Sequence, residues 1–300
     1  MFQPLLQTAN TIISGKETQI KLAIACLLAK GHLLIEDIPG MGKTTLAHLL
    51  ARLFGLDYSR IQFTSDMLPA DIIGISIFEK NTSEFRFHPG PVFSQLVLAD
   101  EINRATAKTQ SALLEAMEEK QITMDGKTYQ LDNPFFVIAT QNPQTQTGTF
   151  PLPESQLDRF LMRIVLGYPD RQTERDILSG ADRREMLHSL NPVFTPQQLV
   201  TMQQQIHKVH ISSALLDYVQ DILQFSRHSQ HFLTGLSPRA GIGLLRSAQA
   251  WAYIHQREMV IPDDIKIILP SIVLHRLIIK DEQNKNEQQI ITLFDELPIP

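Results

Sequence analysis

The amino-acid sequence predicts an α/β fold built on a parallel β-sheet, followed by an all-α domain. Through the first half of the chain, short apolar runs alternate with amphipathic helical segments, which is typical of a parallel sheet covered on both faces. After residue 170 the strand-like runs fade and helical spacing takes over. We therefore expect an α/β core over residues 1–170 and a helical domain over residues 171–300 that carries a polar C-terminal tail.

Five apolar runs in the first half are expected to form the strands of the sheet. Each contains β-branched or aromatic residues, and each is followed by polar or turn-forming residues. In chain order these runs are His32–Glu36, Tyr58–Phe63, Gln95–Ala99, Pro134–Thr140 and Leu161–Leu166.

Two further stretches are expected to form β-hairpins inserted into this scheme. The first joins Ile75–Phe78 to Phe85–Phe87 across a polar turn. The second joins Ile122–Met124 to Thr128–Leu131. Its turn begins with Asp125-Gly126, and Asp-Gly is a strong signal for a tight hairpin turn.

Residues 171–300 place apolar side chains at the spacing of helices. The clearest examples are Leu215, Val219, Ile222 and Leu223, and then Ile265, Ile268, Leu269 and Ile272. Since proline favours the first turn of a helix, helices are expected to begin near Pro192, Pro196, Pro238 and Pro262. The segment Lys280–Gln289 is polar and is expected to be mobile, while Ile290–Phe294 is expected to dock as a last short element.

A glycine-punctuated turn follows the first apolar run. Gly40 and Gly42 allow backbone N–H groups to point at phosphate oxygens, and a helix beginning near Lys43 adds its positive end. The Lys43 ammonium would reach the β- and γ-phosphates, and the Thr44 hydroxyl would ligate Mg²⁺. Asp37 stands where the G-x-x-x-x-G-K-[ST] pattern has its first glycine. The residues expected to hold the nucleotide are Pro39, Gly40, Met41, Gly42, Lys43, Thr44 and Thr45.

Two later apolar runs end in polar residues that would complete a nucleotide-hydrolysing site. Asp100 and Glu101 follow Leu96–Ala99, where phosphate-loop NTPases place an aspartate that holds Mg²⁺ and a glutamate that polarises the attacking water. Asn142 follows Phe135–Thr140 and is a candidate for sensing the γ-phosphate or placing the water. Adjacent acids at a strand end also occur in solvated turns, so this interpretation depends on the phosphate loop upstream.

Composition argues against several other classes of protein. The net charge is −5 and no segment shows the basic excess that is typical of nucleic-acid binders. The longest unbroken apolar stretch, Leu22–Ala29, is too short to cross a bilayer, and the N-terminus lacks the features of a secretory signal. We expect a cytoplasmic protein without membrane insertion. Cys26, the only cysteine, is expected to pack in the core.

Five segments together resemble MoxR-family AAA+ ATPases, which are phosphate-loop NTPases. They are Gly31–Thr44, Ala99–Ala105, Ala139–Pro143, Leu152–Phe160 and Ser237–Ala240. The likeness spans nearly the whole chain, and an aspartate at the position of Asp37 is usual in this family. It implies an AAA+ core with two inserted hairpins and a helical lid, active as a homo-oligomeric ring, commonly a hexamer, with ATP held between neighbouring subunits.

The same resemblance implies roles for two arginines. Arg159 matches the arginine finger that is supplied to the γ-phosphate of the neighbouring subunit. Arg239 matches the second sensor arginine of the lid, and the subunit that it serves is left open. An isolated arginine more often forms a surface ion pair, so both assignments depend on the surrounding motifs.

The leading hypothesis is a Mg²⁺-dependent ATPase that converts ATP to ADP and phosphate and acts as a chaperone-like remodeller. It would assist the assembly or activation of a partner protein or metal-cofactor complex, and the resemblance points to clients that carry a von Willebrand factor A domain. A ring-shaped nucleic-acid motor is an alternative, but the acidic balance of the core argues against it. A nucleotide-gated, non-catalytic scaffold is a third, and the complete set of catalytic residues argues against that.

Overall fold

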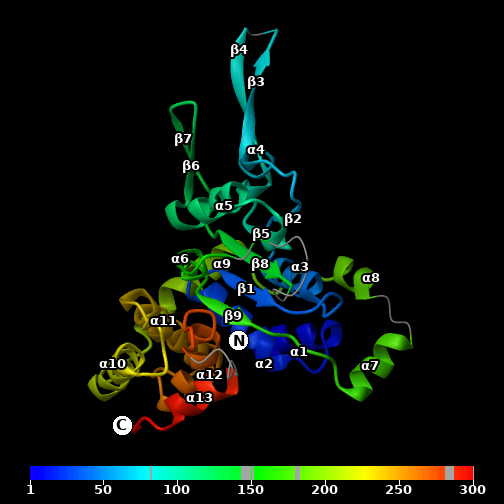
Figure 1. The fold of residues 1–300 in the computed structure, drawn as a ribbon. Helices are drawn as coiled ribbons and strands as arrows, with labels where there is room; N and C mark the ends of the chain where they lie inside the picture. Colours follow the sequence, from blue (N-terminus) through cyan, green and yellow to red (C-terminus); the bar gives the residue numbers. More distant parts are fainter. Residues whose placement is uncertain (82, 143–149, 151, 180–182, 281–286, 300) are drawn as a thin grey trace.

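The computed structural model describes residues 1–300 except 82, 143–149, 151, 180–182, 281–286 and 300. Its centre is a five-stranded sheet in the order β2-β5-β8-β1-β9, in which neighbouring strands run parallel (Figure 1). These strands are β1 Leu33–Glu36, β2 Tyr58–Gln62, β5 Leu96–Asp100, β8 Phe136–Gln141 and β9 Met162–Ile164. The five predicted strands are therefore confirmed, although their ends are shifted slightly.

Side chains that alternate along the strands build one hydrophobic cluster on each face of the sheet. Leu33 and Ile35 belong to the cluster that contains the buried residues of α1, α2 and α3, whereas Leu34 belongs to the cluster of α5. Cys26 is fully buried in the first cluster, as expected, and burial raises the pKa of its thiol. The helices are α1 Gln3–Ile12, α2 Glu17–Leu28, α3 Lys43–Leu53 and α5 Ala107–Glu119.

Both predicted hairpins are present and project from the same side of the core (Figure 1). Their strands are β3 Gly74–Glu79 with β4 Glu84–Pro89, and β6 Gln121–Met124 with β7 Lys127–Gln130. Helix α4 (Pro69–Ile73) leads into the first hairpin, and α5 leads into the second. The rings of Phe87 and Tyr129 stack at a centroid distance of 4.3 Å and so join the two hairpins.

Beyond β9 the described chain is helical, as the sequence predicts. The helices are α7 Arg171–Leu178, α8 Arg183–His188, α9 Pro196–Gln205, α10 Ser213–His228, α11 Pro238–Ile254, α12 Pro262–Val273 and α13 Glu287–Asp295. A short α6 (Glu154–Leu157) precedes β9, and 3-10 turns occur at η1 Pro91–Phe93, η2 Ile102–Arg104 and η3 Ile206–Lys208. Within the part of the chain that is described, no helix is long and apolar enough to cross a membrane.

Helices begin at Pro196, Pro238 and Pro262, but the expected start at Pro192 is wrong. The capping residue in this region is Thr195, whose hydroxyl accepts a hydrogen bond from the backbone N–H of Gln198 while the Gln198 side chain caps Thr195 in return. Pro192 instead lies in the connection between α8 and α9, which is held where the two following backbone N–H groups donate to the carbonyl of Leu53.

The end of the chain docks as predicted, but the polar segment before it is shorter than expected. Ile290 and Phe294 are buried against the helical domain. Residues 287–289 form the first turn of α13, so the last helix begins three residues earlier than expected. Residues 281–286 of that segment lie outside the described residues. Pro143, the last residue of the segment Ala139–Pro143 that resembles the MoxR family, also lies outside them.

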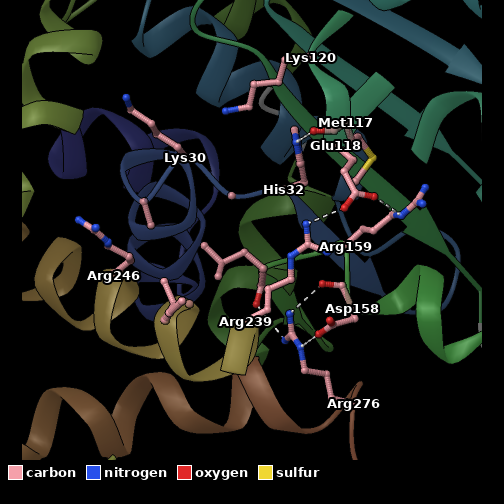
Figure 2. Close-up of a pocket in the computed structure, with 15 residues that line it drawn as sticks. Lys30, His32, Met117, Glu118, Lys120, Asp158, Arg159, Arg239, Arg246 and Arg276 are labelled. Atoms are coloured by element: carbon pink, nitrogen blue, oxygen red, sulfur yellow. Dashed lines mark hydrogen bonds and ion pairs between the residues drawn. The ribbon is translucent and has the colours of Figure 1, made fainter. Parts of the chain in front are cut away.

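A pocket of about 340 Å³ lies between the core and the helical domain (Figure 2). We call it the arginine pocket, because Arg159, Arg239, Arg246 and Arg276 line it. The buried guanidinium of Arg276 donates to the Asp158 carboxylate at 2.7 Å and to the carbonyl of Phe160 at 2.6 Å. Arg276 follows α12, so the helical domain directly clamps the core segment that carries Arg159.

Candidate nucleotide-binding site

The predicted phosphate loop connects β1 to α3 in the structure. Gly40 and Gly42 have φ angles of 89° and 86°, a left-handed conformation that residues with a Cβ rarely adopt. A Cβ at either position would meet no atom within 4 Å, so the backbone conformation, and not a lack of space, requires glycine here. The loop therefore has the local geometry that the sequence predicts.

Asp37, which stands at the position of the first glycine of the pattern, holds the start of the loop through its side-chain carboxylate. One carboxylate oxygen accepts the backbone N–H of Ile38 at 2.9 Å, and the other accepts those of Leu166 and Gly167 at 2.9 and 2.7 Å. Charge-assisted bonds of this kind are stronger than neutral ones. Asp37 thus ties the start of the loop to the chain that leaves β9.

Lys43 begins α3 and turns its side chain back toward the loop. The ammonium donates to the Asn142 side-chain oxygen at 3.0 Å and also to the backbone carbonyls of Asp37 and Ile38. Only 8% of Lys43 is exposed, and burial lowers the pKa of its ammonium, although nearby carboxylates oppose that shift. The cation is therefore positioned before any phosphate arrives.

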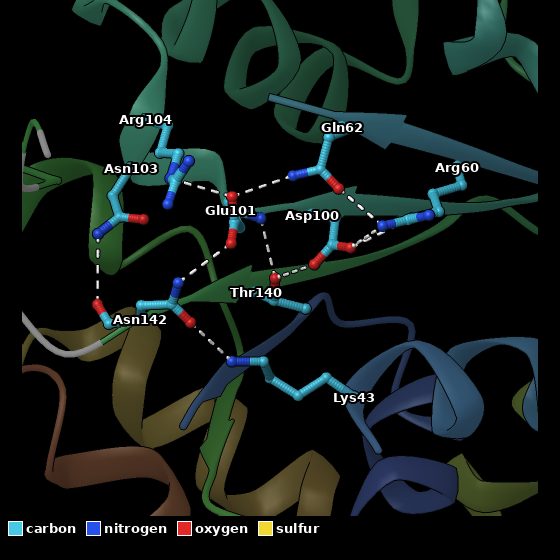
Figure 3. Close-up of polar contacts among 9 residues, drawn as sticks. All are labelled: Lys43, Arg60, Gln62, Asp100, Glu101, Asn103, Arg104, Thr140 and Asn142. Atoms are coloured by element: carbon cyan, nitrogen blue, oxygen red, sulfur yellow. Dashed lines mark hydrogen bonds and ion pairs between the residues drawn. The ribbon is translucent and has the colours of Figure 1, made fainter. Parts of the chain in front are cut away.

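Asp100 lies at the end of β5 with both carboxylate oxygens engaged (Figure 3). One oxygen accepts the Thr140 hydroxyl at 2.6 Å. The other accepts two donors of the Arg60 guanidinium, at 2.7 and 3.1 Å. The structure thus brings Asp100 to the sheet edge beside Lys43, as the sequence predicts, and adds Arg60 from β2.

Glu101 occupies a left-handed backbone conformation with a φ angle of 57°, which is uncommon for a residue with a side chain. Its carboxylate accepts the Asn142 amide and the Gln62 amide, each at 3.1 Å, and pairs with Arg104 at 3.0 Å (Figure 3). Its backbone N–H donates to the Thr140 hydroxyl at 2.9 Å. This network turns the carboxylate toward Asn142 and the phosphate loop.

These groups line one pocket of about 340 Å³, which we call the phosphate-loop pocket. The predicted residues that line it are Pro39, Gly40, Gly42, Lys43, Thr44, Thr45, Asp100, Glu101 and Asn142. Met41 does not line it and packs instead against the hydrophobic core. Thr44 and Asp100 thus supply a hydroxyl and a carboxylate to the same space, and hard oxygen ligands of this kind suit Mg²⁺.

Arg159 and Arg239 do not join this pocket. Both line the arginine pocket, where one carboxylate, that of Glu118, holds them together (Figure 2). Glu118 Oε2 lies 3.1 Å from Arg159 Nε, and Glu118 Oε1 lies 3.0 Å from Arg239 Nη2. The sequence predicts the two arginines as part of the catalytic machinery, and the structure separates them from the phosphate loop of their own chain.

Comparison with known proteins assigns the chain to a family. Family profiles for the ATPase family associated with various cellular activities (AAA) and for the AAA lid domain match residues 32–162 and 224–293. The chain is 46% identical over 283 residues to protein YeaC of Bacillus subtilis, covering 93% of this chain and 88% of that protein. It is 38% identical over 279 residues to the chaperone MoxR1 of Mycobacterium tuberculosis, covering 89% of this chain and 73% of that protein. The chain belongs to the MoxR family of AAA+ ATPases.

A solved structure agrees with this assignment. A candidate ATPase from Cytophaga hutchinsonii superposes with a TM-score of 0.88 at 37% identity, covering 99% of this chain and 96% of that one. The predicted MoxR resemblance and the predicted AAA+ fold with its lid are confirmed. Membership of an AAA+ ATPase family also implies that this chain binds a nucleotide.

Four polar residues of the two pockets or their surroundings were not singled out from the sequence. Arg60 and Gln62 alternate along β2, which pairs in parallel with β5, so their side chains reach the same sheet edge as Asp100 and Glu101. Thr140 is the next-to-last residue of the buried strand β8 and could have been found by the same reasoning. Glu118 carries no local signal, because its partners come from two distant segments.

Proposed function

We propose that this MoxR-family protein hydrolyses ATP to ADP and phosphate with Mg²⁺, in a hexameric ring of identical subunits. In this proposal residues 1–170 form the nucleotide-binding core and residues 171–300 the lid. The protein would work in the cytoplasm as a chaperone-like remodeller of a client protein.

One observation carries the proposal of a shared site. Lys43, Asp100 and Glu101 line one pocket, whereas Arg159 and Arg239 line another. The arginine that does line the phosphate-loop pocket, Arg60, is paired with the Asp100 carboxylate at 2.7 Å. Neither pocket alone offers both the phosphate-binding groups and the two arginines assigned to phosphoryl transfer. A second copy of the chain, with its arginine pocket against the first chain's phosphate loop, would complete the set. Both arginines would then serve the neighbouring subunit.

The residues of the phosphate-loop pocket have separate tasks in this proposal. Lys43 and the backbone of the loop would bind the phosphates, and Thr44 and Asp100 would hold Mg²⁺. The metal ion, when bound, would offset negative charge on the phosphates. Glu101 would polarise the attacking water. Asn142, which contacts both Lys43 and Glu101, would hold these two side chains in position relative to each other.

The chaperone-like role is supported by the relative from Mycobacterium tuberculosis, which bears the name chaperone MoxR1. The two hairpins lie on one side of the core (Figure 1). The first follows β2, which lines the phosphate-loop pocket with Arg60 and Gln62, and the second follows α5, which lines the arginine pocket with Met117 and Glu118. They are therefore suited to carrying a change at the nucleotide to a client. A partner with a von Willebrand factor A domain is the client class that we propose.

The test is a mixing experiment with two inactive variants. Arg159→Ala should bind ATP but hydrolyse it about 10³-fold more slowly, and Lys43→Ala should fail to bind it. Mixed in equal amounts, they should recover up to about a quarter of the wild-type rate, since that share of interfaces joins an intact loop to an intact arginine.

Absence of any recovery, with both variants folded and oligomeric, would contradict a site shared between subunits. The same assay with added DNA separates the proposal from the alternative motor. Strong stimulation by DNA would favour the motor, and no stimulation would favour a protein client.

A further inference from the structure

Glu118 pairs with both Arg159 and Arg239 in the arginine pocket. This residue lies in the last turn of α5, and its carboxylate bridges the two arginines at 3.1 and 3.0 Å (Figure 2). The arginines come from different domains, Arg159 from the segment before β9 and Arg239 from the first turn of α11. One carboxylate thus gathers at one point two guanidinium groups that would otherwise be placed independently.

The charges around this contact are strongly unbalanced. The cationic side chains that line the pocket are Lys30, Lys120, Arg159, Arg239, Arg246 and Arg276. The acidic ones are Glu118 and Asp158, and Asp158 is already bound by Arg276 at 2.7 Å. Glu118 is therefore the anion that faces Arg159 and Arg239, in a pocket with an excess of positive charge.

The geometry of the bridge resembles that of a phosphate contact. A carboxylate offers two anionic oxygens to two guanidinium groups, as a phosphate would, and arginine binds both kinds of group by charge-assisted hydrogen bonds. The side chain of Glu118 is 35% exposed and that of Arg239 is 55% exposed, so both can rearrange without opening a core.

We propose that Glu118 is a placeholder for the γ-phosphate of the neighbouring subunit's nucleotide. It keeps the two arginines together while no phosphate is present and releases them when the phosphate arrives. Glu118 is then a positioning residue that acts through Arg159 and Arg239. This proposal rests on the shared site of the proposed function.

Because Glu118 would compete with the γ-phosphate for the two arginines, removal of its charge should raise the affinity for ATP. Glu118→Gln keeps the size of the side chain but removes the charge that the phosphate must displace. Binding of ATP across the interface should become tighter by about three- to tenfold, the size expected when two partly exposed ion pairs no longer have to be broken. If Glu118 were only a brace, a residue that holds the arginines in place for ATP, the same substitution should weaken ATP binding, because the arginines would be misplaced.

The experiment measures nucleotide-driven assembly in a chain that cannot hydrolyse ATP. Glu118→Gln is combined with Glu101→Gln, and mass photometry follows oligomer formation as ATP with Mg²⁺ is added. The control combines Glu101→Gln with Glu119→Gln, which removes the same charge from the next, exposed position of the helix, outside the pocket. The Glu118→Gln chain should assemble at about three- to tenfold lower ATP than the control.

A kinetic measurement separates the placeholder from a brace. In the hydrolysing chain, Glu118→Gln should lower the KM for ATP without lowering kcat, because the ion pairs are already broken when the phosphate is bound. A lower kcat, or assembly at the same or higher ATP than the control, would overturn the proposal. If the control binds ATP but never assembles, the shared site itself fails and this inference falls with it.

Discussion

The phosphate-loop pocket and the arginine pocket have the same size, about 340 Å³ each, and differ in their charged groups. The phosphate-loop pocket presents carboxylates that are paired with Arg60 and Arg104. The arginine pocket presents guanidinium groups that are paired with Glu118. Each half of the proposed active site thus carries its own counter-charges, so these charged groups of a single chain are already paired before a second copy is added.

The pockets also differ in how they are built. The phosphate-loop pocket uses the ends of neighbouring strands, which one sheet holds in register. The arginine pocket uses both domains, and the buried Arg276 joins them. The first pocket should therefore resist changes in the helical domain, and the second should follow them.

The sharpest test of the first pocket is Glu101→Gln. ATP should stay bound, because the loop and the proposed metal ligands are unchanged, while turnover should fall by about 10²- to 10⁴-fold, the range for loss of a general base. Calorimetry of ATP binding and a phosphate-release assay measure the two quantities. Glu115→Gln, on an exposed position of α5, is the control. Unchanged turnover would remove Glu101 from its assigned role.

The arginine pocket is tested with Arg276→Met, which removes the guanidinium that joins the two domains. Methionine keeps the apolar stem but removes the 2.7 Å and 2.6 Å hydrogen bonds of the guanidinium to Asp158 and to the carbonyl of Phe160, and the Asp158 carboxylate keeps the longer contact with the Ser237 hydroxyl, at 3.4 Å. We expect a loss of about 3 kcal/mol in the free energy of unfolding, at the low end for a broken buried pair because Asp158 is partly exposed. Hydrolysis should also fall, since the segment that carries Arg159 loses its clamp.

The matched control for this variant is Arg257→Met. Arg257 pairs with Asp264 at the start of α12, in the same domain but away from the arginine pocket. It should lower the stability measured in urea and leave hydrolysis nearly unchanged. Equal losses of hydrolysis in the two variants would show that general destabilisation, and not the arginine pocket, sets the rate.

A smaller effect should come from His32, which lines the arginine pocket and directly precedes β1. Its Nδ1 accepts the backbone N–H of Val137, and its Nε2–H donates to the carbonyl of Met117. Burial lowers the pKa of His32 to about 4. The unfolded chain therefore takes up a proton near pH 6.5, and the folded chain does so only near pH 4.

It follows that stability is full above about pH 6.5 and falls as the pH is lowered toward 4, with about 2 kcal/mol lost by pH 5. His32→Gln should remove this part of the acid sensitivity. Urea unfolding of both proteins between pH 4 and 7.5 measures the difference. Parallel curves for the two proteins would contradict a neutral, buried His32.

The sequence was a good guide wherever the chemistry is local. Each of these predictions depends on only a few neighbouring residues: the strands on short apolar runs, the phosphate loop on the glycines at 40 and 42, and the catalytic acids on the carboxylates at 100 and 101. Position 37 shows the limit, because its carboxylate is explained by backbone groups beyond β9. The Glu118 bridge is hidden for the same reason, since only the packing of two domains brings its three members together.

Pro192 shows a different limit. Proline favours the start of a helix, but a helix begins where its free N–H groups find acceptors, and here Thr195 provides that cap. A rule based on one residue type was thus overruled by the residue that satisfies the backbone.

The stacked rings of Phe87 and Tyr129 have a mechanical consequence. The contact joins two hairpins that leave the core at different points, and a stacked pair contributes about 1 kcal/mol, so it favours motion of the two together. A displacement that enters through β2 or through α5 would be shared between them. The two hairpins, which project from the same side of the core, would then move as one unit (Figure 1).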